Sequence, residues 1–266
     1  MERLSIIFRL LAAWLLLSTM VDLSRAVGTR LAVLTAPQSA VELPRSVQTR
    51  RTMMERLALA KVHAQSNRTV GEQLLINVLK DARDPQIRDH AAMALLELAV
   101  NDWPRGYRQE FLATIVPSAL ESAVTHALPP SIILSQAILE SGWGRSQLAK
   151  KHHNLFGIKA GKTQNSVTLP TLEVTRKGVA IRQANFRRFE SAQDSIAQHG
   201  KLLGADPRYA SAREHPENWR QFLADLAPVY ASEPQYAGHI TQLIDTYALD
   251  RWDDLSVSRG NTHLQS

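Results

Sequence analysis

The chain has 266 residues, of which 44% are hydrophobic and 21% charged, and its formal net charge is +6. This composition is typical of a globular protein, with enough apolar residues for one sizeable core and a small helical extension. There is no cysteine, which excludes a disulfide scaffold and a cysteine nucleophile.

Residues 1–26 predict a cleaved secretory signal peptide. Arg3 and Arg9 precede an apolar stretch, and Ser24 and Ala26 are the small residues that a signal peptidase reads. The alternative is an uncleaved membrane anchor, but the uncharged run is shorter than the roughly 20 apolar residues that span a bilayer. We therefore expect a periplasmic or secreted protein, with no stable membrane insertion after cleavage.

The basic charge indicates anionic partners. Outside the cytoplasm these are the cell-wall polymer and lipid headgroups. The sequence has no stripe of Lys and Arg with interleaved aromatic residues, so nucleic acid is not an expected partner.

Residues 27–50 show no sustained period and are interpreted as a linker. Residues 51–104 predict a short helical extension of three helices. Thr69 with Glu72 is typical of a capping box, and Asp84 followed by proline is typical of a helix start. Two roles stay open for the extension: it binds a partner in envelope assembly, or it packs against the rest of the chain.

Residues 105–254 predict the main domain, which begins with an amphipathic helix that Pro117 kinks or divides. Ser131 is the expected N-cap of the next helix. Gly142 is placed to end that helix by adopting the left-handed conformation.

Between residues 160 and 191 the apolar period changes from helical to alternating, which predicts a β-hairpin. Helical patterns return up to residue 249, and residues 255–266 are interpreted as a tail. The predicted fold class is mainly α (α+β): a helical body with one small β-hairpin lobe, preceded by the helical extension.

Glu140 is the first candidate for chemistry. It lies in the last turn of an apolar helix, where the helix dipole and burial both raise the pKa of a carboxyl group. A carboxylic acid that stays protonated near neutral pH can act as a general acid. The alternative is a glutamate that points to water or pairs with Arg145.

A glycosidase usually needs a second carboxylate, and Glu173 in the predicted hairpin is the best candidate, unless it faces solvent. Aromatic rings that could stack on sugars, or simply pack in the core, flank the two acids: Trp143, Phe156, Phe186, Tyr230 and Tyr236. His152 and His153 lack further ligands at metal-binding spacing, so neither a metal nor another cofactor is expected.

The segment PPSIILSQAILESGWGRSQLAKKHHNLFGIKA closely resembles the core motif of the glycoside hydrolase family 73 glucosaminidases. The segments TLEVTRKG, ANFRRFESAQDSI and YASEPQYAGHITQLIDTYAL resemble later motifs of the same family, in the same order. The resemblance covers about residues 108–252 and does not include the helical extension.

The resemblance implies a lysozyme-like fold and hydrolysis of the β-1,4 bond after N-acetylglucosamine in the glycan strands of peptidoglycan. It implies that Glu140 is the general acid, Glu173 the second carboxylate and Tyr236 a tyrosine lining the catalytic site. It also implies that four residues shape the glycan groove: Gln136, Trp143, Asn154 and Phe156.

Three positions depart from the family pattern, namely Val174, Gln198 and Glu233. The role of Glu173 stays open, because the substrate's acetamido group could replace a protein carboxylate. Two other functions stay open as well: a lytic transglycosylase on the same fold, and a non-catalytic module that binds the cell wall.

Overall fold

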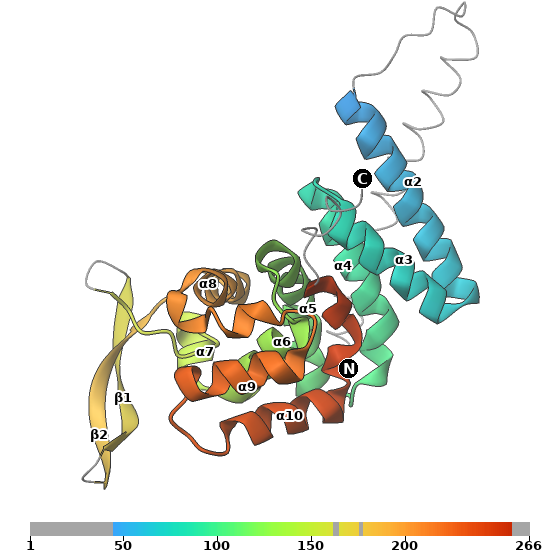
Figure 1. Cartoon of the computed structure of the whole chain (residues 1–266). Helices are drawn as coiled ribbons and strands as arrows, with labels where there is room; N and C mark the ends of the chain where they lie inside the picture. The colour runs from blue at the N-terminus through green and yellow to red at the C-terminus, as the bar shows by residue number, and fades with distance from the viewer. Residues whose placement is uncertain (1–44, 162–164, 176–177, 257–266) are drawn as a thin grey trace, which may run out of the picture. The chain divides into compact units, whose positions relative to one another are not determined.

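The computed structural model describes residues 45–161, 165–175 and 178–256. The predicted signal peptide, most of the predicted linker and residues 257–266 lie outside this part of the chain. Residues 45–50, part of the predicted linker, belong to the first described helix (Figure 1). The linker prediction is wrong there because no glycine or proline interrupts the sequence from Arg45 to Ser66.

Residues 48–256 form one unit. Its extension comprises helices α2 (Arg45–Ser66), α3 (Arg68–Asp81) and α4 (Pro85–Ala99) and the short 3₁₀ helix η1 (Val100–Asp102). The main body comprises α5 (Tyr107–His126), α6 (Pro130–Ser141), α7 (Gln147–His152), α8 (Ala192–Ala205), η2 (Pro207–Tyr209), η3 (Ala212–Glu214), α9 (Trp219–Tyr230), α10 (Tyr236–Tyr247) and η4 (Leu249–Ser256).

The start of α4 is as predicted, and the start of α3 is not. The Asp84 side chain accepts a hydrogen bond from the Gln86 N–H at 2.9 Å. For α3, the N-cap is Asn67, whose side-chain oxygen accepts from the Val70 N–H at 3.2 Å. The predicted cap at Thr69 is wrong because the helix already begins at Arg68.

For the main body, one expectation is narrowed and another changes. Helix α5 continues through Pro117, so the proline does not divide it. Helix α6 begins one residue before the expected N-cap, so Ser131 lies inside it. The Ser131 backbone N–H and hydroxyl instead donate to the Asp253 carboxylate of η4 at 2.9 and 2.6 Å. A distant carboxylate therefore binds the N-terminus of α6, where unpaired N–H groups need an acceptor.

Helix α6 lies at the centre of the core. Its residues from Pro130 to Ile138 are all buried, and it packs against α5, α9, α10 and η4. A helix that is buried on every side over this length must be covered by neighbouring helices all round. Its last turn, which carries Glu140, reaches the surface.

Strands β1 (Ser166–Thr175) and β2 (Gly178–Arg187) pair antiparallel along their whole length, from Ser166↔Arg187 to Thr175↔Gly178. The predicted hairpin is confirmed (Figure 1). Its base is tied to the segment before it, because the Arg187 N–H donates to the Ile158 carbonyl at 2.9 Å.

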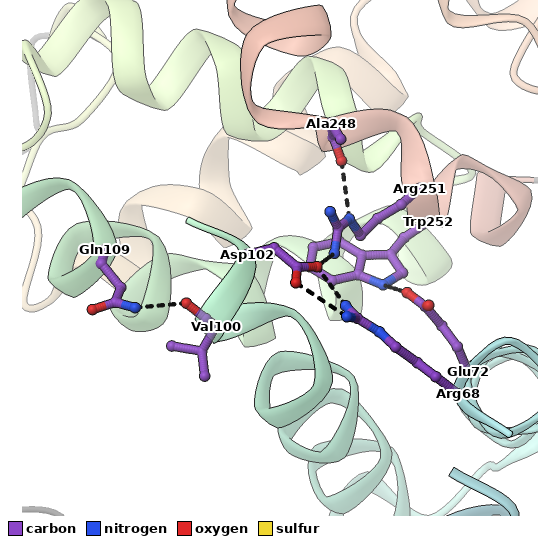
Figure 2. A network of polar contacts seen from close by, with 8 residues as sticks. All are labelled: Arg68, Glu72, Val100, Asp102, Gln109, Ala248, Arg251 and Trp252. Carbon is purple, nitrogen blue, oxygen red and sulfur yellow. Dashed lines mark hydrogen bonds and ion pairs between the residues drawn. The ribbon is translucent and has the colours of Figure 1, made fainter. Parts of the chain in front are cut away.

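The extension packs against α5 and η4 of the main body, and Figure 2 shows the polar contacts with η4. The Trp252 indole N–H donates to the Glu72 carboxylate at 3.0 Å. Asp102 binds Arg68 on one side and Arg251 at 2.7 Å on the other. Of the two roles that the sequence left open, packing against the body is thus observed.

The architecture confirms the predicted fold class, a mainly helical body with a two-stranded antiparallel lobe. None of the helices in the described ranges combines the length and apolarity needed to cross a bilayer.

Candidate active site

A tight turn stops α6 directly after Glu140. Gly142, Trp143 and Gly144 all have left-handed backbone conformations, with φ of 56°, 61° and 70°. Tryptophan rarely adopts this conformation, and such strain is often found at functional sites. The Ser141 hydroxyl stabilises the turn, because its oxygen accepts from the Gly144 N–H at 2.6 Å. The sequence ESGWG thus sets where the Glu140 side chain leaves the helix.

Gln136, Tyr236 and Glu140 lie together. The Gln136 amide donates to the Tyr236 hydroxyl oxygen at 2.8 Å, and both side chains are buried. The Tyr236 hydroxyl in turn makes a hydrogen bond with Glu140. Since Gln136 occupies an acceptor position of the phenol, the phenol proton is free to point to the carboxylate. The structure thus brings together three of the predicted site residues.

The Glu140 carboxyl has a strongly raised pKa. The side chain is accessible to solvent on one side, but desolvation by the surrounding protein raises its pKa to about 7. The hydrogen bond from Tyr236 opposes this shift, and the negative charge of Glu233 adds to it. The carboxyl group can therefore hold a proton near neutral pH.

Glu233 is a neighbour that sequence analysis did not select. It appeared there only as a departure from the family pattern, yet its charge acts on Glu140. It lies three residues before Tyr236, and its carboxylate is 3.6 Å from the His239 ring. The short spacing to Tyr236 is the signal that could have identified it.

Aromatic rings stack behind Tyr236. Tyr230 lies against Tyr236 with ring centroids 5.6 Å apart. His199 contacts the edge of Tyr230 and stacks on Phe156 at 3.8 Å. His199 is fully buried, and desolvation lowers its pKa to about 3. The predicted residue Phe156 is therefore part of the packing that supports the tyrosines, and His199 is a residue that periodicity alone did not reveal.

Trp143 and Asn154 have other neighbours. The Trp143 ring contacts Tyr247 with ring centroids 4.8 Å apart and Phe111 with ring centroids 6.2 Å apart. The Asn154 amide donates to the carbonyls of Ile158 and Arg187, and its oxygen accepts from two backbone N–H groups. The half-buried Trp143 ring thus packs against its neighbours, and Asn154 holds its loop against the end of β2; contact of either residue with glycan stays a prediction.

Arg145 does not pair with Glu140 in the described part of the structure; its guanidinium lies over the Tyr107 ring at 4.8 Å. Glu173 lies in β1 opposite Ala180, near the tip of the hairpin, and its side chain is outside the described part of the structure. Within the described ranges, no three His, Cys, Asp or Glu side chains are grouped so as to hold a metal ion.

Known proteins resemble this chain. LytG, an exo-glucosaminidase of Bacillus subtilis, is 33% identical over 146 residues, which are 53% of this chain and 51% of LytG. A probable N-acetylmuramidase of Lactococcus lactis subsp. cremoris is 34% identical over 160 residues, 58% of this chain and 36% of that protein. The chain thus spans about half of the first relative and less of the second.

Among solved structures, the catalytic domain of the autolysin Auto from Listeria monocytogenes superposes with a TM-score of 0.51 at 33% identity, covering 56% of this chain and 89% of that one. This agreement supports the lysozyme-like fold that the sequence predicts. The family model described as "Glucosaminidase: Mannosyl-glycoprotein endo-beta-N-acetylglucosaminidase" matches residues 116–249. This range contains Glu140 and Tyr236, and the chain belongs to this glucosaminidase family.

Proposed function

We propose that the chain is a peptidoglycan hydrolase that cleaves the β-1,4 bond between N-acetylglucosamine and N-acetylmuramic acid, with Glu140 as the general acid. The observation that carries the proposal is the Glu140 carboxyl, which is accessible to solvent and has a pKa of about 7. A glycosidic oxygen leaves as an alcohol only if it gains a proton, and such a carboxyl group can supply it at neutral pH.

Tyr236 and Gln136 position the acid. Gln136 holds the Tyr236 hydroxyl from the core at 2.8 Å, and Tyr236 holds the Glu140 carboxyl. After proton transfer the Glu140 carboxylate is negative, and the phenol proton stabilises that charge. Tyr230 stacks on Tyr236 and helps to fix its ring.

The second carboxylate has two candidates, Glu173 from the resemblance and Glu233 from its electrostatic effect on Glu140. Comparing Glu173→Gln with Glu233→Gln separates them, because only the true partner loses turnover on removal of its charge. Near-normal turnover in either variant eliminates that residue. If both variants keep turnover, the substrate's own acetamido group remains as the nucleophile.

The central test is the Glu140→Gln variant, assayed on purified peptidoglycan. Loss of a general acid lowers the rate by about 10²–10⁴-fold. Glu97→Gln is the matched control, since Glu97 is an exposed glutamate of α4 outside the site. If wild type and Glu140→Gln clear peptidoglycan equally well, the chain is not an enzyme of this kind and the wall-binding alternative takes its place.

Analysis of the product ends tests which bond is cleaved. The relatives differ on this point, since one is named a glucosaminidase and another an N-acetylmuramidase. Reducing N-acetylglucosamine ends support the proposal. Reducing N-acetylmuramic acid ends would show that the other glycosidic bond is cleaved. Ends with 1,6-anhydro-N-acetylmuramic acid would show that the protein is a lytic transglycosylase.

We also propose that the chain acts in the periplasm or after secretion, on the basis of residues 1–26. Binding of an envelope-assembly partner by residues 51–104 stays a prediction. On α2 the side chains of Leu59 and Val62 are 54% and 61% exposed, and they are the residues to replace in testing it.

A further inference from the structure

Two arginines flank an exposed tyrosine beside the turn that follows Glu140. The Arg145 guanidinium lies over the Tyr107 ring at 4.8 Å. The Arg108 guanidinium donates to the Tyr107 hydroxyl oxygen at 3.2 Å and lies 5.2 Å from the Trp143 ring centroid. Tyr107 is 44% exposed, and both arginines are exposed. These side chains come from α5 and from the ESGWGR segment.

The two guanidinium groups have aromatic partners in the described structure, and no carboxylate binds them there. Arg108 donates to the hydroxyl oxygens of Tyr107 and Tyr247, the latter at 2.8 Å. Other arginines of this chain differ: Arg56 and Arg88 pair with Asp81 and Glu121, each at 2.8 Å. Two positive charges are thus fixed side by side at the surface without a neutralising acid.

The local electrostatics favour negative charge at this place. The hydrogen bond from Arg108 and the charges of both arginines lower the pKa of the Tyr107 hydroxyl. A surface that stabilises a phenolate also stabilises a carboxylate, and arginine binds carboxylates through two parallel N–H groups. The ring contacts hold the guanidinium planes, which reduces the entropy lost when a ligand binds.

We propose that Arg108, Arg145 and Tyr107 form a binding site for the carboxylates of the peptide stems that peptidoglycan carries on its muramic acid residues. The inference rests on the proposed function. Arg145 follows Glu140 by five residues, and the Gly142 carbonyl accepts from its backbone N–H at 3.2 Å. Because five residues separate Arg145 from Glu140 along the chain and a tight turn joins them, the proposal places a neighbouring segment of a polymer bound at Glu140 at the arginines.

The features of this site fit a polymer with charges at intervals better than they fit a lipid surface. A membrane site would be expected to combine basic residues with an exposed apolar face that enters the lipid. Here the aromatic side chains other than Tyr107 are engaged: Trp143 packs against Phe111 and Tyr247.

The experiment measures binding of the full chain in the Glu140→Gln form, so that no substrate is consumed. Purified sacculi are compared with the same sacculi from which an amidase has removed the peptide stems. The test variants are Arg145→Gln and the double variant Arg108→Gln with Arg145→Gln. Arg83→Gln is the matched control, because Arg83 is exposed and lies outside the cluster, before α4.

We expect the double variant to weaken binding to intact sacculi by about three- to tenfold, the range expected for solvent-exposed charge pairs. Binding to stripped sacculi should not change, and Arg83→Gln should bind both like the parent. With active protein, KM on intact sacculi should rise while kcat stays constant, as for a lost contact that is equally strong in ground and transition states.

Equal binding by parent and variants overturns the inference, and so does equal weakening on both kinds of sacculi. Vesicles of anionic phospholipid serve as a further probe: if the double variant loses vesicle binding and keeps sacculus binding, the site is for membranes. Absence of turnover in the wild type would overturn the proposed function alone, since the binding comparison does not require hydrolysis. If loss of the Arg108 hydrogen bonds disturbs folding of the double variant, the single variant Arg145→Gln, which keeps them, still tests the site.

Discussion

Two neighbours of the Glu140 carboxyl shift its pKa in opposite directions. Its pKa is about 7, with desolvation and the charge of Glu233 raising it and the Tyr236 hydrogen bond lowering it. A general acid works only while protonated, so the rate should fall as the pH rises through the pKa of Glu140. We therefore predict that kcat/KM falls on the alkaline side of a pH profile, with an apparent pKa near 7.

Replacing Tyr236 by phenylalanine tests this balance. Tyr236→Phe removes the hydrogen bond that lowers the Glu140 pKa, so the alkaline limb should move to higher pH. The maximal rate should fall, because the carboxylate formed on proton transfer loses its donor. Tyr247→Phe, at the other end of α10, is the control and should keep the limb in place. A limb that moves to lower pH would contradict the assigned hydrogen bond.

The element that carries Glu140 is held at its other end by Asp253. This buried carboxylate of η4 accepts two hydrogen bonds from Ser131. Burial raises the pKa of Asp253 to about 7, from 3.8 in the unfolded chain. The folded state therefore binds this proton more tightly than the unfolded state does. The resulting contribution to the free energy of unfolding is fully present below about pH 4 and is lost as the pH rises through about 7.

Two substitutions of Asp253 separate charge from hydrogen bonding. Asp253→Asn keeps an oxygen acceptor for the Ser131 N–H and removes the titration, so relative to wild type it should gain stability between about pH 5 and pH 8. Asp253→Ala leaves the α6 N-terminus without its acceptor and should be about 2 kcal/mol less stable than Asp253→Asn at both pH values, since neither variant titrates at this position. Urea unfolding of the three proteins measures both effects, and equal pH dependence of wild type and Asp253→Asn would disprove the raised pKa.

Helix α8 contains a histidine without a hydrogen-bond partner. Both ring nitrogens of His199 are buried and unpaired in the described structure, and its pKa is lowered to about 3. In the unfolded chain this histidine takes up a proton near pH 6.5, whereas in the folded state it stays neutral down to about pH 3. Its contribution to stability is therefore present above pH 6.5 and is lost as the pH falls toward 3.

Replacing His199 by phenylalanine should therefore stabilise the protein. His199→Phe keeps an aromatic ring on Phe156 and removes two unpaired polar atoms, a gain of about 1 kcal/mol near neutral pH. The gain should grow in acid, where only the wild type is destabilised by protonation. Thermal unfolding at about pH 5 and pH 8 checks this, and a loss of stability at the higher pH would show that a histidine nitrogen has a polar partner.

At the scale of the whole described unit, η4 joins the extension to the main body. Trp252 is fully buried and donates to Glu72 (Figure 2). Its ring also contacts the Trp103 ring edge to face, with ring centroids 6.2 Å apart. Because one tryptophan packs against both parts, the extension and the body should unfold in one cooperative transition. Asp253 follows Trp252 directly, so the same segment also reaches the start of α6.

The Trp252→Ala variant tests this coupling. Removing a buried tryptophan costs about 3–5 kcal/mol, because of lost burial and the cavity that remains. The control Arg56→Gln breaks an exposed ion pair with Asp81 in the extension and should cost at most about 1 kcal/mol. Urea unfolding should show one transition at lower concentration for Trp252→Ala. Two separate transitions in the wild type would disprove the coupling.

Local signals in the sequence predicted the elements well where a few neighbouring residues decide the outcome. Asp84 begins α4, Gly142 ends α6, and the alternating pattern predicted a hairpin whose strands pair from Ser166 to Thr175. The predictions failed where two caps competed or a distant group intervened. Asn67 caps α3 ahead of Thr69, and Ser131 binds Asp253 when it was expected to cap its own helix.

The sequence by itself determined the order of helices and strands, the family resemblance and the candidate acid Glu140, because helical period, caps and turns act over a few residues. Only the tertiary structure decided which groups surround that acid. Tyr236 is 100 residues from Gln136, and Asp253 is 122 residues from Ser131. Such contacts depend on how whole helices pack, as does the placement of the Trp143 ring between Tyr247 and Arg108.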